Sequence, residues 1–520
     1  MYKYTHIKDI DTSPLLNNNI ELNNLNPPDI NQFCSSNIEN KLLSDNKLLS
    51  DIYYYWYKGG YWTIILTAIL KIATFLYTMF YLIIITTCID YNVLYKTHNF
   101  NKSVNIINGF NSTMGVFLIM VTGLGFIICL ISLYKKISEL NIVYKICVEY
   151  KINVLHDDWN TCLQKIIKNQ LLLNGNENIV DYTGEYNKRI LKFDNFIIGL
   201  YTNVIQIPNI NQEIFFLPKL LQWAIYNIIY MVFSDGKISS IENVYMKSVK
   251  LKTYFKYVGL MLFITCPFIF IYTCMYVFFK YIQEIKSTPK ILSSRQYSNF
   301  AKLKFRHFNE LPHIFDNRLT KSFVLADEYV SIYTNRWVVI LSQFTCFIIG
   351  SILGIMTLLL LVDENMLIEG NFLWGKTLIF YMTILGALYS LFSCFNTFNI
   401  MDSLYIESLY EKLFNILNIN PIYVINHNNN SLQKLHIFKK YYQYTFLLIL
   451  VDLIGVFFTP FILYFYMTRK SMEIASFFEQ YTYNHERLGN ICSLSEKTNI
   501  DCIQDEMYKS KMKNSFQMNN

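Results

Sequence analysis

The sequence predicts an all-α polytopic membrane protein with four transmembrane helices and two re-entrant membrane helix hairpins, joined by cytosolic helices. Hydrophobic residues make up 53% of the 520 residues and charged residues only 16%, a composition typical of chains that cross a bilayer several times. Six apolar segments are long enough, or nearly so, to cross a hydrocarbon core of about 30 Å at about 1.5 Å per helical residue. The placement of lysine and arginine then separates the four spans from the two re-entrant segments.

The first 52 residues are predicted to form a disordered cytosolic tail. They are rich in Asn, Asp and Leu and include the near-repeat KLLSDNKLLSD at residues 41–51, which is low-complexity sequence. DTSPLL at residues 11–16 has the pattern of a vesicle-sorting signal, although chance also produces such short patterns. No stretch has the features of a cleaved signal peptide, so we expect the first span to act as its own insertion signal.

Residues 62–88 and 115–134 form the first predicted pair of spans. Lysines lie on the outer flanks of this pair at positions Lys41, Lys47, Lys58, Lys135 and Lys136. The positive-inside tendency therefore places both flanks in the cytosol, with residues 89–114 on the far side and residues 135–256 cytosolic. The far-side loop holds the N-glycosylation acceptor sequences NKS at Asn101 and NST at Asn111.

Residues 257–279 contain Pro267 and are predicted to be re-entrant. A full crossing would put a basic segment, residues 280–336, in the lumen and the acidic linker DENMLIEG, residues 363–370, in the cytosol, both against the positive-inside tendency. A chain that turns back near Pro267 keeps residues 280–336 cytosolic. The alternative is that this proline only kinks an ordinary span, since proline is common in transmembrane helices.

Residues 444–467 repeat this pattern around Pro460, because a full crossing would place Arg469 and Lys470 outside. The predicted spans are thus residues 62–88, 115–134, 337–362 and 377–395, with residues 396–443 cytosolic and both termini cytosolic. Each proline removes a backbone donor. Broken backbone at membrane depth is tolerated only where protein buries it or water reaches it, which indicates a hydrated cavity.

Several function classes have no residues to support them. The sequence has no Walker loop, no G-x-G-x-x-G after a strand, no H-E-x-x-H and no G-x-S-x-G, and its eleven cysteines form no C-x-x-C pair. His307, Glu310 and His313 imitate a metal site, but Pro312 disturbs the helix that would align them, so structural hydrogen bonding is the better interpretation. We expect no enzymatic turnover, cofactor, metal or nucleic acid partner.

Ionisable residues inside apolar segments are the first candidates for a polar route. Lys71 lies about ten residues into the first span, and Asp452 lies inside the last segment. Such residues usually face a bundle interior or water, although Lys71 could instead snorkel to the surface. With hydroxyl groups such as Thr377 and Thr383, they would let polar headgroups slide while acyl tails stay in the bilayer, without an energy source.

Several strings resemble the autophagy-related protein 9 family of multispanning membrane proteins. They run in family order across residues 53–495: TTCIDYNVLY, YNKRILKFDNF, FRHFNELPHIFDNRL, GSILGIMTLLLLVDENML and TPFILYFYMTRKSMEIASFFEQYT. The resemblance implies a domain-swapped homotrimer with four spans and two re-entrant segments per protomer, an arrangement that agrees with the charge argument. The remaining residues 496–520 would form a short C-terminal tail in place of the family's long one.

The resemblance also implies an ATP-independent phospholipid scramblase that acts on membrane phospholipids. It would re-equilibrate leaflets while a lipid-transfer protein of the autophagy-related 2 type feeds lipid into a growing autophagosomal membrane. The expected location is in vesicles derived from Golgi and endosomes and at the preautophagosomal membrane.

The resemblance implies headgroup or partner contacts for a basic cluster that follows the first proline segment, and of this cluster Lys286 carries over. We expect the basic residues that follow it to meet headgroups at the cytosolic mouth as well, so the full set of candidates is Lys286, Lys290, Arg295, Lys302, Lys304 and Arg306. The string EIKSTPK retains Lys286 but has Ser287 and Thr288 where the family has further charged residues. The family's pore-facing threonines fall near Thr377 and Thr383.

Three alternative functions remain open at this stage. The trimer could be a vesicle scaffold that recruits lipid-transfer and autophagy factors, with scrambling incidental. The membrane machinery could serve organelle biogenesis in a divergent organism. A re-entrant-loop ion channel fits the hairpins but lacks a filter-like repeat or charged ring.

Overall fold

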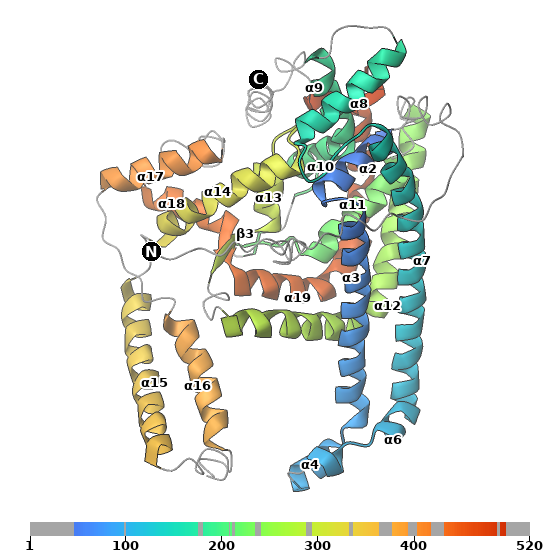
Figure 1. Cartoon of the computed structure of the whole chain (residues 1–520). Coiled ribbons are helices and arrows are strands. Elements are labelled where there is room, and N and C mark those ends of the chain that lie inside the picture. The colour runs from blue at the N-terminus through green and yellow to red at the C-terminus, as the bar shows by residue number, and fades with distance from the viewer. Residues whose placement is uncertain are drawn as a thin grey trace. The chain divides into compact units, whose positions relative to one another are not determined.

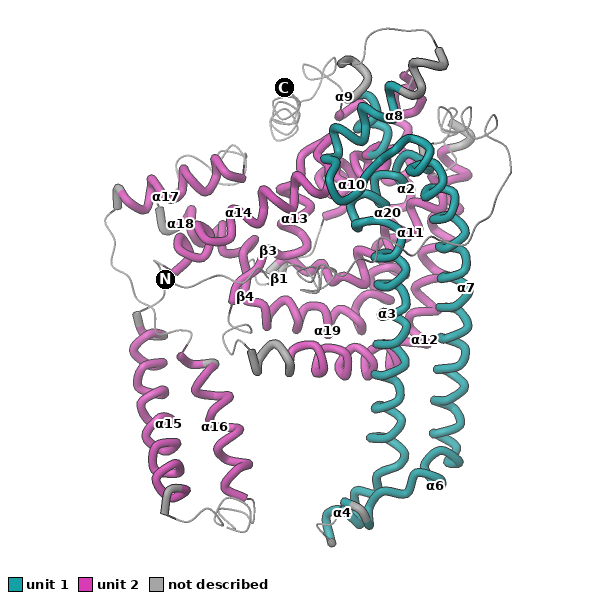
Figure 2. The backbone as a smooth tube through the Cα atoms, in the orientation of Figure 1, with its two compact units in different colours: residues 1–190 teal, residues 191–520 magenta. Residues whose placement is uncertain are grey.

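The computed structural model is mostly helical in the part of the chain that it describes, as the sequence predicts. The described residues are 46–97, 100–174, 180–206, 209–210, 214–233, 241–287, 294–331, 336–362, 377–393, 403–417, 431–485 and 489–495. Residues 1–45 and 496–520 of the two predicted tails lie outside the described residues, whereas residues 46–52 of the first tail lie in a helix, Asn46–Tyr57. The chain divides into two compact units, residues 1–190 and 191–520 (Figure 2).

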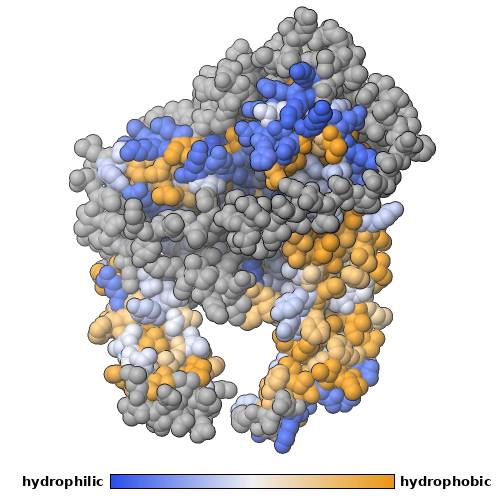
Figure 3. Space-filling view, in the orientation of Figure 1, coloured by the Kyte–Doolittle hydropathy of each residue, from blue (hydrophilic) through white to orange (hydrophobic). Residues whose placement is uncertain are grey.

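Two long helices form the apolar part of the first unit. They are α3 (Tyr61–Ile83), which continues into the π-helical turn η3 (Ile84–Cys88), and α7 (Thr113–Glu149). The two helices lie side by side (Figure 1). They are antiparallel, because the Tyr61 hydroxyl donates to Asn141 Oδ1 at one end (2.8 Å). Their exposed surface is largely hydrophobic (Figure 3), as a lipid-facing helix pair requires.

Short elements close both ends of this helix pair. Before it, α2 (Asn46–Tyr57) turns into α3 through Gly59 and Gly60, whose φ angles of 79° and 95° favour glycine. At the other end, α4 (Tyr91–Thr97), α5 (Phe100–Ser103) and α6 (Ile106–Asn111) connect η3 to α7.

The rest of the first unit packs against the charged end of α7. Here α8 (Trp159–Asn174) precedes α9 (Val180–Ile190), and α9 contacts both α2 and α8. The buried core that joins this part consists of Ile52, Tyr55, Ile64, Leu140, Val143, Ile146, Cys147, Tyr150 and Ile166. Burial of these side chains fixes the start of α3 against the last turns of α7.

The second unit is built around α12 (Ile241–Ser287) and a continuous helical run of α19 (Thr445–Phe461), η8 (Ile462–Met467) and α20 (Thr468–Tyr481). All three parts of this run pack against α12. The ring pairs Phe263–Phe461 and Phe270–Phe457 show that the two runs are antiparallel. Figures 1 and 2 show that α12 changes direction sharply part-way along its length.

The sequence predicts that the chain turns back in the membrane near Pro267 and Pro460. Both prolines lie inside helices that continue beyond them. A proline removes only one hydrogen bond of the helix and clashes with one preceding carbonyl, which produces a bend where other donors and π-turns compensate. The π-helical turn η8 begins two residues after Pro460 and is such an adjustment. The re-entrant topology itself stays a prediction.

Another apolar helix pair in the second unit is α15 (Arg336–Val362) with α16 (Leu378–Ser393). The two helices pack against each other along their length (Figure 1). The Ser342 hydroxyl donates to the carbonyl oxygen of Phe392 at 2.5 Å, which links the start of α15 to the end of α16. Such hydroxyl-to-carbonyl bonds are a common means of joining helices in a membrane.

The remaining elements of the second unit are shorter helices and strands that pack around two hydrophobic cores. The helices are α10 (Lys192–Asn203), α11 (Lys219–Phe233), α13 (Asn299–Phe305), α14 (Pro312–Ser331), α17 (Ser403–Ile416) and α18 (Ser431–Tyr441). The strands form three short antiparallel pairs. These pairs are β1 (Asn209–Ile210) with β2 (Ile214–Phe215), β3 (Arg295–Tyr297) with β4 (Tyr442–Tyr444), and β5 (Thr482–His485) with β6 (Gly489–Cys492). A short 3₁₀ helix, η9 (Ser493–Ser495), follows β6. One core joins α10, α11, α12 and α20, and a second joins α13, α14, α17 and α18.

All six predicted apolar segments fall in helices where they are described, except for the first residues of two segments, Thr377 and Tyr444, and Tyr444 lies in β4. Within the described residues, five helices are long and apolar enough to cross a membrane: Tyr61–Cys88, Thr113–Glu149, Val244–Tyr281, Val339–Leu360 and Thr445–Tyr481. Leu378–Ser390 is a shorter apolar helix. Length and composition alone do not separate spans from re-entrant helices, so the count of four and two stays a prediction.

Candidate functional site

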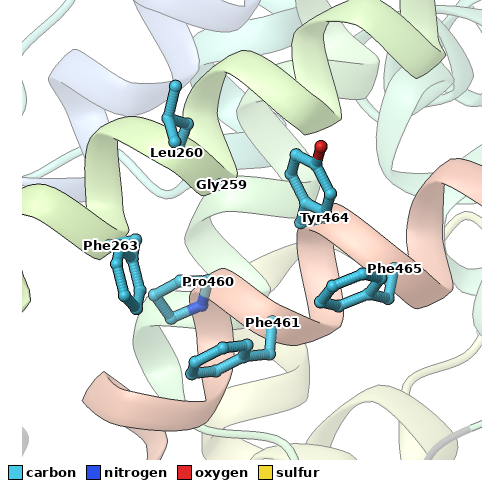
Figure 4. Close-up of a pocket in the computed structure, with 7 residues that line it drawn as sticks. All are labelled: Gly259, Leu260, Phe263, Pro460, Phe461, Tyr464 and Phe465. Atoms are coloured by element: carbon cyan, nitrogen blue, oxygen red, sulfur yellow. The ribbon is translucent and has the colours of Figure 1, made fainter.

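The two proline-containing helices approach each other closely at Gly259 of α12. A Cβ atom at this position would lie 3.1 Å from the carbonyl oxygen of Pro460 and 3.3 Å from Tyr464. Glycine therefore permits the two backbones to cross closely. Beside the crossing is an open cavity of about 180 Å³, lined by Gly259, Leu260, Phe263, Pro460, Phe461, Tyr464 and Phe465 (Figure 4). Its almost wholly apolar lining suits hydrocarbon and not a headgroup.

The backbone around Pro460 gains an unusual donor. Proline has no N–H, so the carbonyl oxygen of Val456 lacks its usual α-helical partner four residues on. The Cys266 thiol, from the other helix, donates to this oxygen at 3.7 Å. Cys266 is buried and directly precedes Pro267. The Cys266 side chain, next to Pro267, thus satisfies the Val456 carbonyl oxygen that Pro460 leaves without its helical donor.

Asp452, the predicted polar residue of the last segment, lies where α19 meets the start of α11. Its Oδ1 accepts a hydrogen bond from the backbone N–H of Lys219 at 3.0 Å. Its Oδ2 lies 3.6 Å from the Lys219 ammonium nitrogen. A carboxylate at a helix N-terminus satisfies a free N–H and complements the helix dipole. The carboxylate therefore has a definite structural task within an apolar segment.

Gly455, three residues after Asp452, makes this contact possible. A Cβ atom at Gly455 would lie 2.2 Å from the Cβ atom of Pro218, which directly precedes α11. No side chain fits there without displacement. Asp452 and Gly455 thus fix the same face of α19 against the beginning of α11, one by polar contact and one by close approach.

Lys71, the predicted polar residue of the first span, lines a cavity between α3 and α7. The cavity has a volume of about 350 Å³. Its lining comes from α2, the turn after it, α3 and α7: Tyr54, Lys58, Thr67, Ala68, Lys71, Ile72, Ile128, Cys129, Ser132, Leu133 and Lys136. In the sequence, Lys58 and Lys136 indicate only the orientation of the chain in the membrane. Their convergence with Lys71 depends on the antiparallel pairing of α3 and α7, which no local motif encodes.

The two predicted threonines belong to the α15–α16 pair. Thr377 is half-buried just before α16, and Thr383 is exposed on α16 with its hydroxyl bonded to the carbonyl oxygen of Phe380 at 2.9 Å. This local bond satisfies the hydroxyl within its own helix. The most extensive contacts of α16 are with α15, and none of the described hydrogen bonds or ion pairs joins these threonines to Asp452. Their role in a lipid route stays a prediction.

The basic cluster predicted to meet headgroups is partly used inside the fold. Arg306 pairs with Asp194 at 2.7 Å, and the Lys304 ammonium donates to the Tyr441 hydroxyl at 2.6 Å. The Arg295 guanidinium lies 4.5 Å from the centroid of the Tyr444 ring. These contacts join α10 to the end of α13, α13 to α18, and β3 to β4.

The other members of the cluster are less defined. Lys302 is half-buried on α13. Lys286 lies in the last turn of α12, where the structure describes the backbone and not the side chain. Lys290 lies outside the described residues. A role for the cluster in headgroup or partner contact stays a prediction.

A buried polar cluster follows α13, in the string FNELPH. Glu310 accepts two hydrogen bonds from the Arg318 side chain, at 2.8 and 2.7 Å, and one from the backbone N–H of His307 at 2.9 Å. Asn309, at a φ of 58°, donates to the carbonyl oxygen of Ser495 at 3.0 Å. The interpretation of this string as structural is thus supported. Among the described residues, no group of three or more His, Cys, Asp or Glu side chains could hold a metal ion.

The two glycosylation acceptors lie on the connection between η3 and α7. Asn101 lies in α5, and Asn111, at the end of α6, is exposed. Exposure suits glycan attachment at Asn111. Modification of either asparagine stays a prediction.

Comparison with known proteins decides the family. A model of the family described as Autophagy protein ATG9 matches residues 39–497. The chain belongs to this family. The resemblance predicted from the sequence strings is thereby confirmed.

Individual ATG9 relatives agree with this assignment. Autophagy-related protein 9 of Kluyveromyces lactis is 27% identical over 92% of this chain and 55% of its own length. The Saccharomyces cerevisiae protein is 28% identical over 87% and 48%, and the Dictyostelium discoideum protein 24% identical over 89% and 68%. The chain spans about half the length of the curated fungal relatives it matches.

The fold also matches a solved ATG9 structure. The electron cryomicroscopy structure of Schizosaccharomyces pombe Atg9 superposes with a TM-score of 0.63 at 22% sequence identity. The match covers 88% of this chain and 98% of that one. At this identity the likeness establishes the fold.

Proposed function

We propose that the chain is an ATP-independent phospholipid scramblase of autophagy vesicles. It would work as a homotrimer and re-equilibrate leaflets as a lipid-transfer protein of the autophagy-related 2 type delivers lipid. Membership of the ATG9 family supports a role in autophagy membranes. The route would be lined by Lys71, Asp452, Thr377 and Thr383, with the basic cluster at its cytosolic mouth.

The observation that carries the proposal is the charged pair Asp452–Lys219. Asp452 lies within a helix apolar enough to cross a membrane, yet its side chain is 23% exposed and the Lys219 side chain is 72% exposed. Charges at membrane depth are costly unless water or polar groups reach them. Lipid headgroups and water passing along α19 would supply that contact.

A leaflet-exchange assay tests the proposal. The purified chain is reconstituted in liposomes that carry fluorescent phospholipid in both leaflets, and dithionite, which does not cross the membrane, is added outside. Bleaching well beyond one half, with dithionite and ion leakage excluded, supports scrambling. Bleaching that stops near one half contradicts scrambling and leaves a vesicle scaffold as the alternative function.

Two substitutions address the route. Thr383→Trp should slow exchange by adding bulk, whereas Ile384→Trp on the same helix, at the same depth and also exposed, serves as its control. Asp452→Asn keeps an acceptor for the Lys219 N–H but removes the charge, so a slower rate would reflect charge and not loss of the cap. Equal rates in wild type and both test variants would contradict the proposed lining.

A further inference from the structure

We propose that the cavity between α3 and α7 binds the phosphate-bearing headgroup of an anionic phospholipid. The cavity has a volume of about 350 Å³ and lies within one compact unit. This inference deepens the proposed function, because Lys71 is also one of the residues proposed to line the lipid route. The binding inference requires only that α3 and α7 lie in a membrane. It does not require that the bound lipid is transported.

The charge of the cavity favours an anion. Of the eleven described residues that line it, three are lysines and none is acidic: Lys58, Lys71 and Lys136. Two of these ammonium groups lie near the same aromatic ring, since Lys58 is 5.9 Å and Lys136 is 5.4 Å from the centroid of Tyr54. Like charges gathered in a small volume repel one another, and a bound phosphate would relieve that repulsion.

The direction of the helices explains why lysines from distant positions converge. In an α-helix each Cα–Cβ bond tilts toward the N-terminus. On α3 this tilt directs Lys71 toward the Lys58 end, and on the antiparallel α7 it directs Lys136 toward Lys71. Long lysine side chains extend this reach by snorkelling. The hydroxyls of Thr67 and Ser132 add polar groups between the ammonium groups.

The surroundings favour a lipid over a free anion. The cavity lies between two helices whose outer faces are hydrophobic (Figure 3). Ile128 lines the cavity and is 66% exposed, and Leu70 and Leu124 on the neighbouring helix faces are 50% and 63% exposed. A phospholipid can therefore place its headgroup among the lysines and its acyl chains along α3 and α7. A soluble phosphate would leave these apolar faces uncovered.

Binding of short-chain lipids to the full chain in detergent tests the inference. The probes are dioctanoyl phosphatidylinositol 4-phosphate, dioctanoyl phosphatidylcholine and inorganic phosphate, titrated separately by calorimetry. We expect saturable binding of the anionic lipid and at least tenfold weaker binding of the other two. Equal affinity for phosphatidylcholine would overturn charge recognition, and equal affinity for inorganic phosphate would overturn the lipid.

Charge-matched variants assign the binding to this cavity. Lys71→Gln with Lys136→Gln should weaken binding by about 25-fold, because each lysine that faces an anionic headgroup contributes about a fivefold factor. The control is Lys135→Gln with Lys145→Gln, which removes the same charge from exposed positions of α7 outside the cavity lining. Equal losses in the two double variants would show a diffuse charge effect and overturn the inference.

A third variant keeps every charge and fills the space. Ala68 lines the cavity on α3, so Ala68→Trp should abolish binding while all three lysines remain. Binding at wild-type strength would overturn the inference. Since the titrations are made in detergent without leaflets, a protein that binds but does not scramble would contradict only the proposed function.

Discussion

The Cys266 thiol lies 3.7 Å from the carbonyl oxygen of Val456, the oxygen that Pro460 leaves without its helical donor. This contact joins the two proline-containing helices at the place where each departs from regular α-helix. Because the thiol is a weak donor, a side chain with a stronger donor can replace Cys266 and keep this hydrogen bond, whereas a side chain without a donor removes it.

We expect Cys266→Ala to lower the stability of the second unit. The loss of the hydrogen bond should cost about 0.6 to 1.5 kcal/mol, and the lost sulfur adds a small cavity. Cys266→Ser keeps a donor at the same position and serves as the control. Thermal unfolding in detergent should rank wild type and the serine variant above the alanine variant. An alanine variant as stable as wild type would show that the contact has no energetic role.

Close approach of helices leads to a second prediction, at Gly455. A Cβ atom there would lie 2.2 Å from Pro218, so Gly455→Ala must move α19 away from the start of α11 and weaken the Asp452 cap. Overpacking of this kind costs about 1 to 3 kcal/mol. Gly354→Ala is the control, because nothing lies within 4 Å of its added Cβ. A Gly455→Ala variant as stable as the control variant would refute the close approach in solution.

The helices of this chain can be predicted from its sequence, but the contacts that bend and join them cannot. Long apolar runs encode helices directly, so all six segments appear. The donor that compensates Pro460 comes from a residue 190 positions earlier in the chain, and the N–H that meets Asp452 comes from one 233 positions earlier. Neither leaves a local pattern. The helix therefore continues through Pro460 beside a donor supplied at long range, which no local pattern predicts.

The buried pair Glu310–Arg318 gives a third prediction. The Glu310 side chain has no exposed surface and the Arg318 side chain 7%, and the Arg318 guanidinium also bonds to the carbonyl oxygens of Phe305 and Leu417. Glu310→Gln leaves a buried positive charge without its counter-charge, which costs about 3 to 5 kcal/mol. We expect poor folding of Glu310→Gln, measured as yield and thermal unfolding.

An exposed pair provides the contrast. Lys47 and Glu139 lie 2.7 Å apart with side chains 55% and 41% exposed, and Glu139→Gln should cost about 1 kcal/mol or less. The double variant Glu310→Gln with Arg318→Met should be less destabilised than Glu310→Gln alone, since it removes the uncompensated charge. Equal effects of Glu310→Gln and Glu139→Gln would contradict the burial of the first pair.

Asp327 on α14 supplies a pH-dependent prediction. Burial raises the pKa of its carboxyl group, and this outweighs the opposing effects of a hydrogen bond from the Tyr442 hydroxyl (2.7 Å) and the charge of Arg295. A group whose pKa is raised in the folded state gives stability that is fully present below its unfolded pKa, about 3.9, and is lost as the pH rises through the folded pKa.

Asp327→Asn, which has no titrating group, should therefore gain stability over wild type as the pH rises from about 4. Thermal unfolding measured between pH 4.5 and 7.5 should show this growing difference, with Asp316→Asn on the exposed face of the same helix as the control for carboxylate removal. A difference that shrinks with rising pH would reverse the sign of the shift and show that Arg295 and Tyr442 dominate over burial.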